Sequence, residues 1–165
     1  MTKEELGTLV LNSQDSLYRV AKSILRDDDD CNDAIHEAIA NAFSNIQSLK
    51  KDKYAKTWLT RILINECYQI LKKQSKNLPL DEQSYLIDYT SNEDYYDLYN
   101  AIMNLKNELR MCIVLYYVEG YKIKEIAKIL DTTESAVKKR LVRGREKLKI
   151  DLEGGKEIWF KKSIS

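Results

Sequence analysis

Hydrophobic residues recur every three or four positions along most of this 165-residue chain, which is the spacing of amphipathic helices. The pattern runs from Leu6 to Leu25, from Ala34 to Leu49, from about Thr57 to Lys73, and from Leu98 to Tyr116. Between residues 77 and 94 it fades, and the only proline, Pro79, lies there among many polar residues. The pattern predicts an all-α fold of two small helical domains joined by a linker.

Two shorter helical patterns stand close together near the end of the second domain. The first has an apolar face made by Ile123, Ile126, Ala127 and Leu130, and the second has one made by Val137, Leu141 and Leu148, with Gly144 beside them. Between them, Asp131 tolerates a left-handed backbone better than most residues, and Thr132 or Thr133 can cap the second helix. This spacing predicts a helix-turn-helix, whose second helix enters a major groove of duplex DNA.

Low counts of helix-breaking residues support this architecture, because the chain has one proline and five glycines. We place the first domain at residues 1–75, the linker at 76–95 and the helix-turn-helix domain at 96–152. The remaining residues, 153–165, form a tail to which the sequence assigns no role.

Charge is distributed in blocks, although the formal net charge is only +1. Residues 27–37 and 77–97 hold six acids each and no Lys or Arg, so the linker is acidic. Residues 50–76 hold eight basic residues against two acids, and residues 122–149 hold ten against four. Basic blocks of this kind indicate contact with a polyanion.

The second helix of the helix-turn-helix is the most basic segment, since seven of the twelve residues at 138–149 are Lys or Arg. The residues expected to contact duplex DNA lie opposite or beside its apolar face: Ser135, Lys138, Lys139, Val142 and Arg143. A helix pair with a merely solvated basic face would explain the apolar spacing. It would leave seven cations against a single acid unexplained, so we favour DNA binding.

Aromatic, amide and cationic side chains share one side of the stretch from Thr57 to Lys73, and a lysine-rich loop precedes it. Rings that stack on bases, together with cations that hold phosphates, suit single-stranded DNA. The candidate residues are Tyr54, Trp58, Arg61, Asn65, Tyr68 and Lys72. The alternative, in which Trp58 and Tyr68 belong to the core, stays open.

Other classes of site find little support. Cys31, Cys67 and Cys112 are widely spaced, and His36 is the only histidine, so neither a disulfide framework nor a metal site is predicted. Phosphate-loop and hydrolase motifs are lacking, so we expect no cofactor and no enzyme activity. The sequence shows neither a membrane-length apolar run nor a signal peptide, and we therefore expect a cytoplasmic protein without membrane insertion.

Two long stretches resemble a known family. The segment "AIMNLKNELRMCIVLYYVEGYKIKEIAKILDTTESAVKKRLVRGREKLK" resembles the C-terminal domain of bacterial sigma factors. Upstream, "LYRVAKSILRDDDDCNDAIHEAIANAFSNI" and "AKTWLTRILINECYQILKK" resemble the promoter-melting and polymerase-binding domain of the same family. The presence of only these two domains, joined by a short linker, is typical of the extracytoplasmic-function group of the sigma-70 family.

The resemblance implies a role for each segment. Asp33, His36 and Glu37 fall in the segment that binds the β′ clamp helices of core RNA polymerase, with His36 where the family usually has Gln. The helix from Thr57 and its preceding loop would read the opened −10 element, and Asn65 falls on a position implicated in that contact. The helix-turn-helix would read the −35 element.

The family pattern also implies partners beyond promoter DNA. Core polymerase would be contacted through the β′ clamp helices and the β flap, and the acidic linker would run toward the RNA exit path. The usual regulator is an anti-sigma factor, often membrane-linked.

The chain departs from the family at two turns and in its tail. Lys106 stands where proline is common, and Asp131 stands where glycine is common. The tail, with Trp159 and Phe160, has no counterpart that we can place. Two other interpretations remain at this point: a stand-alone helix-turn-helix regulator with an N-terminal sensor domain, and an interaction protein that does not contact DNA.

Overall fold

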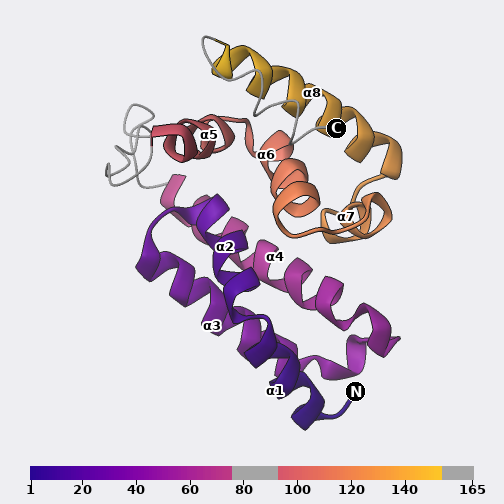
Figure 1. The fold of residues 1–165 in the computed structure, drawn as a ribbon. Helices are drawn as coiled ribbons and strands as arrows, with labels where there is room; N and C mark the ends of the chain where they lie inside the picture. Colours follow the sequence, from indigo (N-terminus) through magenta and orange to yellow (C-terminus); the bar gives the residue numbers. More distant parts are fainter. Residues whose placement is uncertain (76–92, 154–165) are drawn as a thin grey trace. The chain divides into compact units, whose positions relative to one another are not determined.

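The computed structural model describes residues 1–75 and 93–153, and every regular element in these two ranges is helical, as predicted. The elements in chain order are α1 (Lys3–Asn12), α2 (Gln14–Leu25), α3 (Asp28–Ser44), η1 (Ile46–Ser48), η2 (Asp52–Tyr54), α4 (Ala55–Ser75), α5 (Glu93–Met103), α6 (Asn107–Ile113), η4 (Val114–Val118), α7 (Ile123–Ile129) and α8 (Glu134–Leu152). They form two compact units (Figure 1). One contains α1 to α4, and the other contains α5, α6, η4, α8 and most of α7.

The predicted linker and tail lie almost entirely outside the described residues, so their boundaries stay predictions. One difference can be reported at the linker's end. α5 begins at Glu93, inside the range 76–95 that the sequence assigned to the linker. The helix starts before its first apolar anchor, Leu98, because helical hydrogen bonding does not require apolar side chains in the first turn.

The first unit is built around three helices, α2, α3 and α4, which contact one another pairwise, and α1 packs against α2 and α3. Along α3 the buried positions are Cys31, Ala34, Ala38 and Ala42, which recur every three or four residues and lie on one side. Their small side chains let α3 approach α4 closely, and Leu59 and Leu63 of α4 are buried there. The acidic and polar side of α3 is thereby left outside the core.

The hydrophobic stretch from Leu6 to Leu25 folds as two helices instead of one, because α1 ends and α2 begins around the buried Ser13. The spacing has a gap at this point, where no apolar core position lies between Val10 and Leu17. Leu11, which falls in the gap, is 67% exposed. α3 likewise ends at Ser44, so the last apolar positions of its predicted stretch lie in and after η1.

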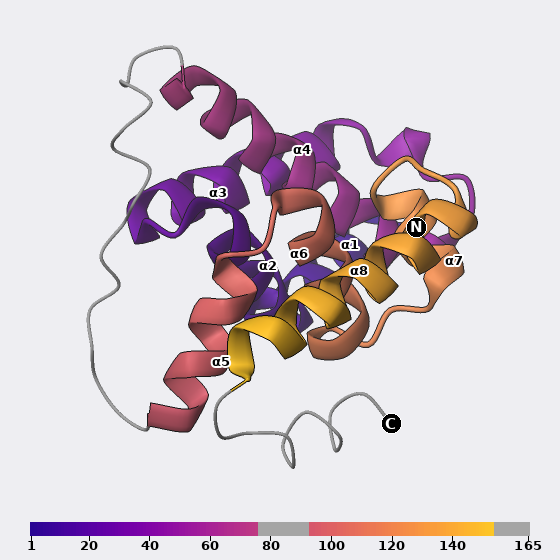
Figure 2. The ribbon, with the colours of Figure 1, turned by 90° about the horizontal axis from the view of Figure 1, so that it is seen from above.

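The second unit packs α8 against α6 and α5 (Figure 2). Gly144 of α8 lies so close to α6 that a methyl group added there would be 2.8 Å from Ile113 Cγ1. Val137, Leu141 and Leu148 are buried on the same side of α8, as the sequence pattern predicted.

A buried arginine shapes the turn between α5 and α6. Arg110 is 8% exposed, and its Nη1 donates to the carbonyl oxygens of Met103 at 2.9 Å and Leu105 at 3.1 Å. These carbonyls belong to the end of α5 and the following turn, where helical partners are lacking. The guanidinium therefore stabilises a break within the spacing from Leu98 to Tyr116 that the sequence pattern did not indicate.

Candidate nucleic-acid and polymerase interfaces

The connection between α7 and α8 has the geometry that its sequence predicted. Asp131 adopts a left-handed backbone with φ of 53°. Thr133 is the residue that caps α8, and its side chain accepts a hydrogen bond from the Ala136 backbone N–H at 3.0 Å. The start of α8 is therefore determined by a local sequence signal. The turn and the cap together set the orientation of α8 relative to α7, its supporting helix.

The exposed side of α8 carries all five residues predicted to contact duplex DNA: Ser135, Lys138, Lys139, Val142 and Arg143. Val142 is 44% exposed although it is apolar. Two other cations of the helix have partners within the second unit, because Arg145 Nη1 lies 3.2 Å from the Tyr117 hydroxyl and Lys147 pairs with Asp151 at 3.1 Å. Arg140 is half-buried and interacts with the buried Cys112, whereas Lys138, Lys139, Arg143 and Lys149 are exposed.

α4 places the second set of candidates along one stripe. Arg61, Asn65 and Lys72 are exposed, and Tyr68 lies between them half-buried at helical spacing. Tyr54, in η2 just before the helix, is half-buried and lies under Lys53, whose Nζ is 5.0 Å from the ring centroid. The stripe therefore combines cations, an amide and half-buried aromatic rings.

Trp58 is half-buried. It is therefore intermediate between a core residue and an exposed stacking surface, the two possibilities that the sequence left open. Its indole Nε1 donates to the Ser48 hydroxyl at 3.2 Å. Ser48 belongs to η1, in the loop that connects α3 to α4. This contact could not be predicted from the sequence, because a serine in a polar loop has no distinctive spacing.

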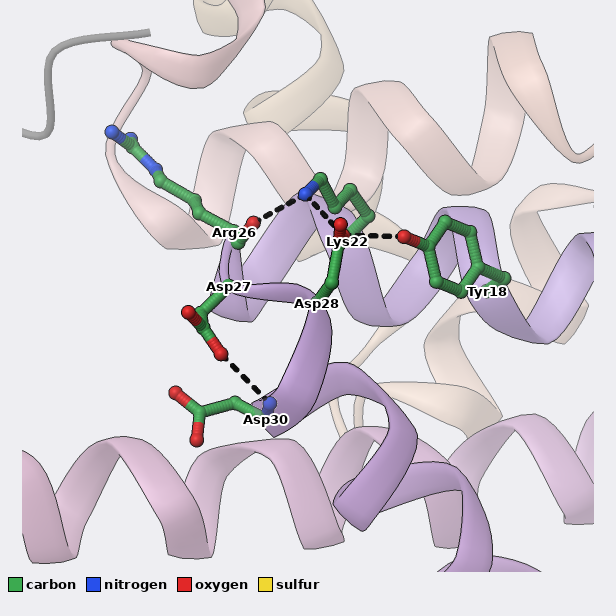
Figure 3. A network of polar contacts seen from close by, with 6 residues as sticks. All are labelled: Tyr18, Lys22, Arg26, Asp27, Asp28 and Asp30. Carbon is green, nitrogen blue, oxygen red and sulfur yellow. Dashed lines mark hydrogen bonds and ion pairs between the residues drawn. The ribbon is translucent and has the colours of Figure 1, made fainter. Parts of the chain in front are cut away.

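The start of α3 is held by a network of polar contacts with α2 (Figure 3). Lys22 Nζ donates to the Arg26 carbonyl and to Asp28 Oδ1, both at 2.5 Å, and the Tyr18 hydroxyl also donates to Asp28. Asp27 caps the helix by accepting from the Asp30 backbone N–H at 3.0 Å. The hydrogen bonds from Lys22 and Tyr18 stabilise the carboxylate and lower the pKa of Asp28 below its usual value.

Downstream of this network, the three predicted polymerase-binding residues are all exposed. Asp33 and His36 are three residues apart and share a face, and Glu37 lies beside them. The buried Ala34 and Ala38 occupy the opposite side of α3. A further hydrogen bond, from Gln74 Nε2 of α4 to Asp30 Oδ2 at 2.7 Å, joins the acidic start of α3 to α4.

The sequence pattern assigned no functional role to an exposed apolar segment of the second unit. Tyr116, Tyr117 and Val118 follow one another in the π-helical turn η4, and each is more than a third exposed. The two rings meet edge to face with centroids 4.9 Å apart. Such wide turns occur often at functional sites, and the only available signal was a run of three large residues at a helix end.

Residues 1–75 and 93–153 contain neither a cluster of metal ligands nor a thiol with the lowered pKa of a reactive cysteine. No group of three or more His, Cys, Asp or Glu side chains in those ranges could hold a metal ion. Burial raises the pKa of the Cys31 thiol to about 11 and that of Cys67 to about 12, and it also raises the pKa of Cys112. Within the same ranges, no helix has the length and apolar character that crossing a membrane requires.

Comparison with known proteins decides between the remaining interpretations. Residues 9–77 match the family model for sigma-70 region 2, and residues 95–148 match that for sigma-70 region 4. The RNA polymerase sigma factor SigV of Bacillus subtilis (strain 168) is 30% identical over 154 residues, which cover 92% of this chain and 93% of SigV. The chain belongs to the sigma-70 family of RNA polymerase sigma factors.

A second relative indicates the subgroup of the sigma-70 family to which the chain belongs. This sigma factor is 31% identical over 135 residues to the ECF RNA polymerase sigma factor SigM of Mycobacterium tuberculosis (strain H37Rv), covering 80% of this chain and 69% of SigM. It is therefore an alternative sigma factor of the extracytoplasmic-function group that directs transcription initiation. A stand-alone regulator would leave the region 2 match unexplained, and sigma factors as a family are not enzymes.

Solved structures share the fold. The Bartonella quintana sigma factor RpoE, solved in complex with the anti-sigma factor NepR, has a TM-score of 0.76 and 22% identity, covering 92% of this chain and 99% of RpoE. CnrH, solved in complex with the cytosolic domain of CnrY, has a TM-score of 0.70 and 20% identity, covering 93% of this chain and 92% of CnrH.

Proposed function

We propose that this sigma factor reads promoters at two elements, the −35 duplex with α8 and the opened −10 strand with α4. The observation that carries the proposal is the two-sided construction of α8. Its core residues fill one side, and all five predicted contact residues lie exposed on the other. A helix seated by one face and basic on the other is the form that enters a major groove.

At the −35 element, the five residues supply different kinds of contact. Arg143 can make a bidentate hydrogen bond to guanine, and the exposed methyl groups of Val142 can contact a thymine methyl. Lys138 and Lys139 suit phosphates, whereas Ser135 at the start of the helix can donate to a phosphate or a base. Base preference should therefore depend mainly on Val142 and Arg143.

At the −10 element, the α4 stripe would act only after the strands separate. Asn65 has amide donors and an acceptor that can read a base edge, and Tyr68 offers a stacking surface. Arg61 and Lys72, on either side, would hold the backbone of the opened strand, with Tyr54 at the loop end.

For polymerase, we assign the exposed face with Asp33, His36 and Glu37 to the β′ clamp helices, because its acids suit a basic partner. The second unit would meet the β flap, which places the predicted acidic linker near the RNA exit path. The relatives solved with NepR and CnrY favour an anti-sigma partner here as well. Family resemblance favours a membrane-linked form of that partner and action in the cytoplasm.

The test uses Asn65→Ala in holoenzyme assembled with core polymerase. We expect core binding to be unchanged, because Asn65 lies on α4 and not on the exposed face of α3. Open-complex formation, measured by permanganate footprinting, should fall by an amount consistent with the loss of one side-chain contact to a base edge, about 1–3 kcal/mol. A template with a pre-melted −10 bubble separates the two roles, because it restores a melting defect but not a lost base preference.

Two outcomes would contradict the proposal. Parent-like opening with an unchanged −10 preference in Asn65→Ala would remove this stripe from strand capture. Tight, specific binding of the parent protein to promoter duplex without polymerase would indicate that the helix-turn-helix acts alone.

A further inference from the structure

The loop between α3 and α4, residues 45–54, leads directly into the proposed strand-capture stripe. It consists of the short turns η1 and η2 with three residues of no regular structure between them. Each turn is closed by local backbone hydrogen bonds, such as Ser48 N–H to Asn45 O at 2.8 Å and Tyr54 N–H to Lys51 O at 3.0 Å. Such contacts fix the turns but not the position of the loop over α4.

Side chains supply that position. Trp58, in the first turn of α4, donates its indole N–H to the Ser48 hydroxyl at 3.2 Å, which ties η1 to the helix. At the other end of the loop, the Met1 amino group pairs with Asp52 of η2 at 2.9 Å. Lys50 and Lys51 lie between these two contacts in the chain, and Lys53 follows Asp52. All three lysine side chains are exposed.

The burial of Trp58 fits this role better than direct stacking on DNA. Its ring is half-buried, and an indole N–H in that situation needs a hydrogen-bond partner, which Ser48 provides. A half-buried ring offers a base less stacking surface than a fully exposed one. The hydrogen bond instead gives the tryptophan a fixed orientation and makes Ser48 its counterpart in the loop.

We propose that Trp58 is a positioning residue, whose hydrogen bond to Ser48 holds the α3–α4 loop in the conformation that receives the opened −10 strand. This inference rests on the proposed function of the α4 stripe. It assigns Ser48 a role that the sequence pattern did not predict, and it changes the role of Trp58 from a stacking surface to a residue that holds the loop.

The experiment compares variants that separate the hydrogen bond from the ring. Trp58→Phe keeps an aromatic face that could stack on a base but lacks the donor. Ser48→Ala removes the acceptor and leaves the tryptophan intact, whereas Ser48→Thr keeps a hydroxyl. Gln47→Ala, an exposed neighbour in the same turn, is the matched control.

Two quantities are measured for each variant: amide hydrogen exchange of residues 49–53 in the free protein, and binding of the holoenzyme to a single-stranded −10 oligonucleotide. Trp58→Phe and Ser48→Ala should each speed loop exchange and weaken oligonucleotide binding about two- to fivefold, the effect of one exposed neutral hydrogen bond. The double variant should be no worse than either single one. Ser48→Thr and Gln47→Ala should match the parent.

Other outcomes overturn the inference in distinguishable ways. Unchanged loop exchange in Ser48→Ala, or additive defects in the double variant, would mean that the hydrogen bond does not hold the loop. Faster exchange with normal oligonucleotide binding, while Asn65→Ala binds weakly, would remove the loop from strand recognition and leave the proposed function standing. Normal binding in Asn65→Ala as well would overturn the proposed function of the stripe itself.

Discussion

Val142 and Arg143 are neighbours in the chain, and both lie on the exposed side of α8. One is apolar and the other is a planar cation, so together they can distinguish a thymine methyl from the acceptor edge of a guanine. The adjacent lysines carry charge without such geometry, because an ammonium group is a compact charge whose contacts are less directional. At the scale of single residues, affinity and base preference should therefore be separable.

We expect Arg143→Ala to weaken −35 binding by about 1–3 kcal/mol and to relax base preference at one position, since a bidentate contact is lost. Lys138→Ala should weaken binding to all sequences more evenly and reduce its salt dependence. Holoenzyme binding to matched and mismatched −35 duplexes at several salt concentrations measures both effects. An unchanged preference in Arg143→Ala would exclude this residue from direct readout.

The Lys22–Asp28 contact predicts a pH-dependent part of the stability. Because the pKa of Asp28 is lower in the folded protein, its contribution is present above the usual pKa of an aspartate and is lost as the pH falls through the folded value. Asp28→Asn should therefore unfold at lower urea concentration than the parent at pH 7. The difference should shrink between about pH 5 and about pH 3. Asp29→Asn, in the same turn, controls for the loss of an acid at the helix start, and a pH-independent difference would contradict the prediction.

At the scale of elements, the contact between α6 and α8 determines how the recognition helix is seated. Gly144 permits that contact, because any larger side chain would collide with Ile113, which is buried. Gly7 of α1 is the opposite case, because nothing lies within 4 Å of the position that its side chain would occupy. The two glycines thus offer the same substitution with and without a steric cost.

Gly144→Ala should lower the free energy of unfolding of the second unit. Forcing a methyl group into a packed contact costs about 1–3 kcal/mol, and the better helix propensity of alanine returns at most about 1 kcal/mol. Gly7→Ala should be neutral or stabilising, since only the propensity term applies. Urea unfolding followed by circular dichroism measures both variants. Equal stability of Gly144→Ala and the parent would show that Ile113 can move aside without loss.

The elements also show what the sequence could predict. The turn before α8 was predictable because Asp131 and Thr133 act locally, through backbone preference and capping. The break between α5 and α6 was not, because it depends on the side chain of Arg110, which reaches back to carbonyls five and seven residues earlier. The same distinction applies to the site, where exposure of the α8 residues follows from periodicity but the Trp58–Ser48 contact requires the fold of the loop.

At the scale of the whole molecule, the net charge of +1 is the sum of acidic and basic surfaces with different proposed partners. We assign the exposed face of α3 with Asp33, His36 and Glu37 to polymerase, and the basic face of α8 to DNA. A promoter contact affects only the promoters that contain its base, whereas a polymerase contact affects every promoter equally. The two kinds of variant should therefore have different signatures in transcription.

We expect Asp33→Lys to reduce core binding and to lower run-off transcription from different promoters by the same factor, because the charge reversal opposes docking on a basic surface. Circular dichroism checks that the variant is folded. Asp15→Lys, an exposed position on α2, makes the same change in net charge and should behave like the parent. Normal core affinity in a folded Asp33→Lys protein would mean that another face of the first unit binds polymerase.

All three cysteines are buried, so thiol reagents have no readily accessible cysteine on the folded protein. Cys31 and Cys67 belong to the first unit, and Cys112 belongs to the second. Labelling of each cysteine must therefore wait until its own unit opens, so the order in which they react would time the opening of the two units separately. A fluorophore could also be attached through a single cysteine introduced on the surface of either unit, without first replacing the native ones.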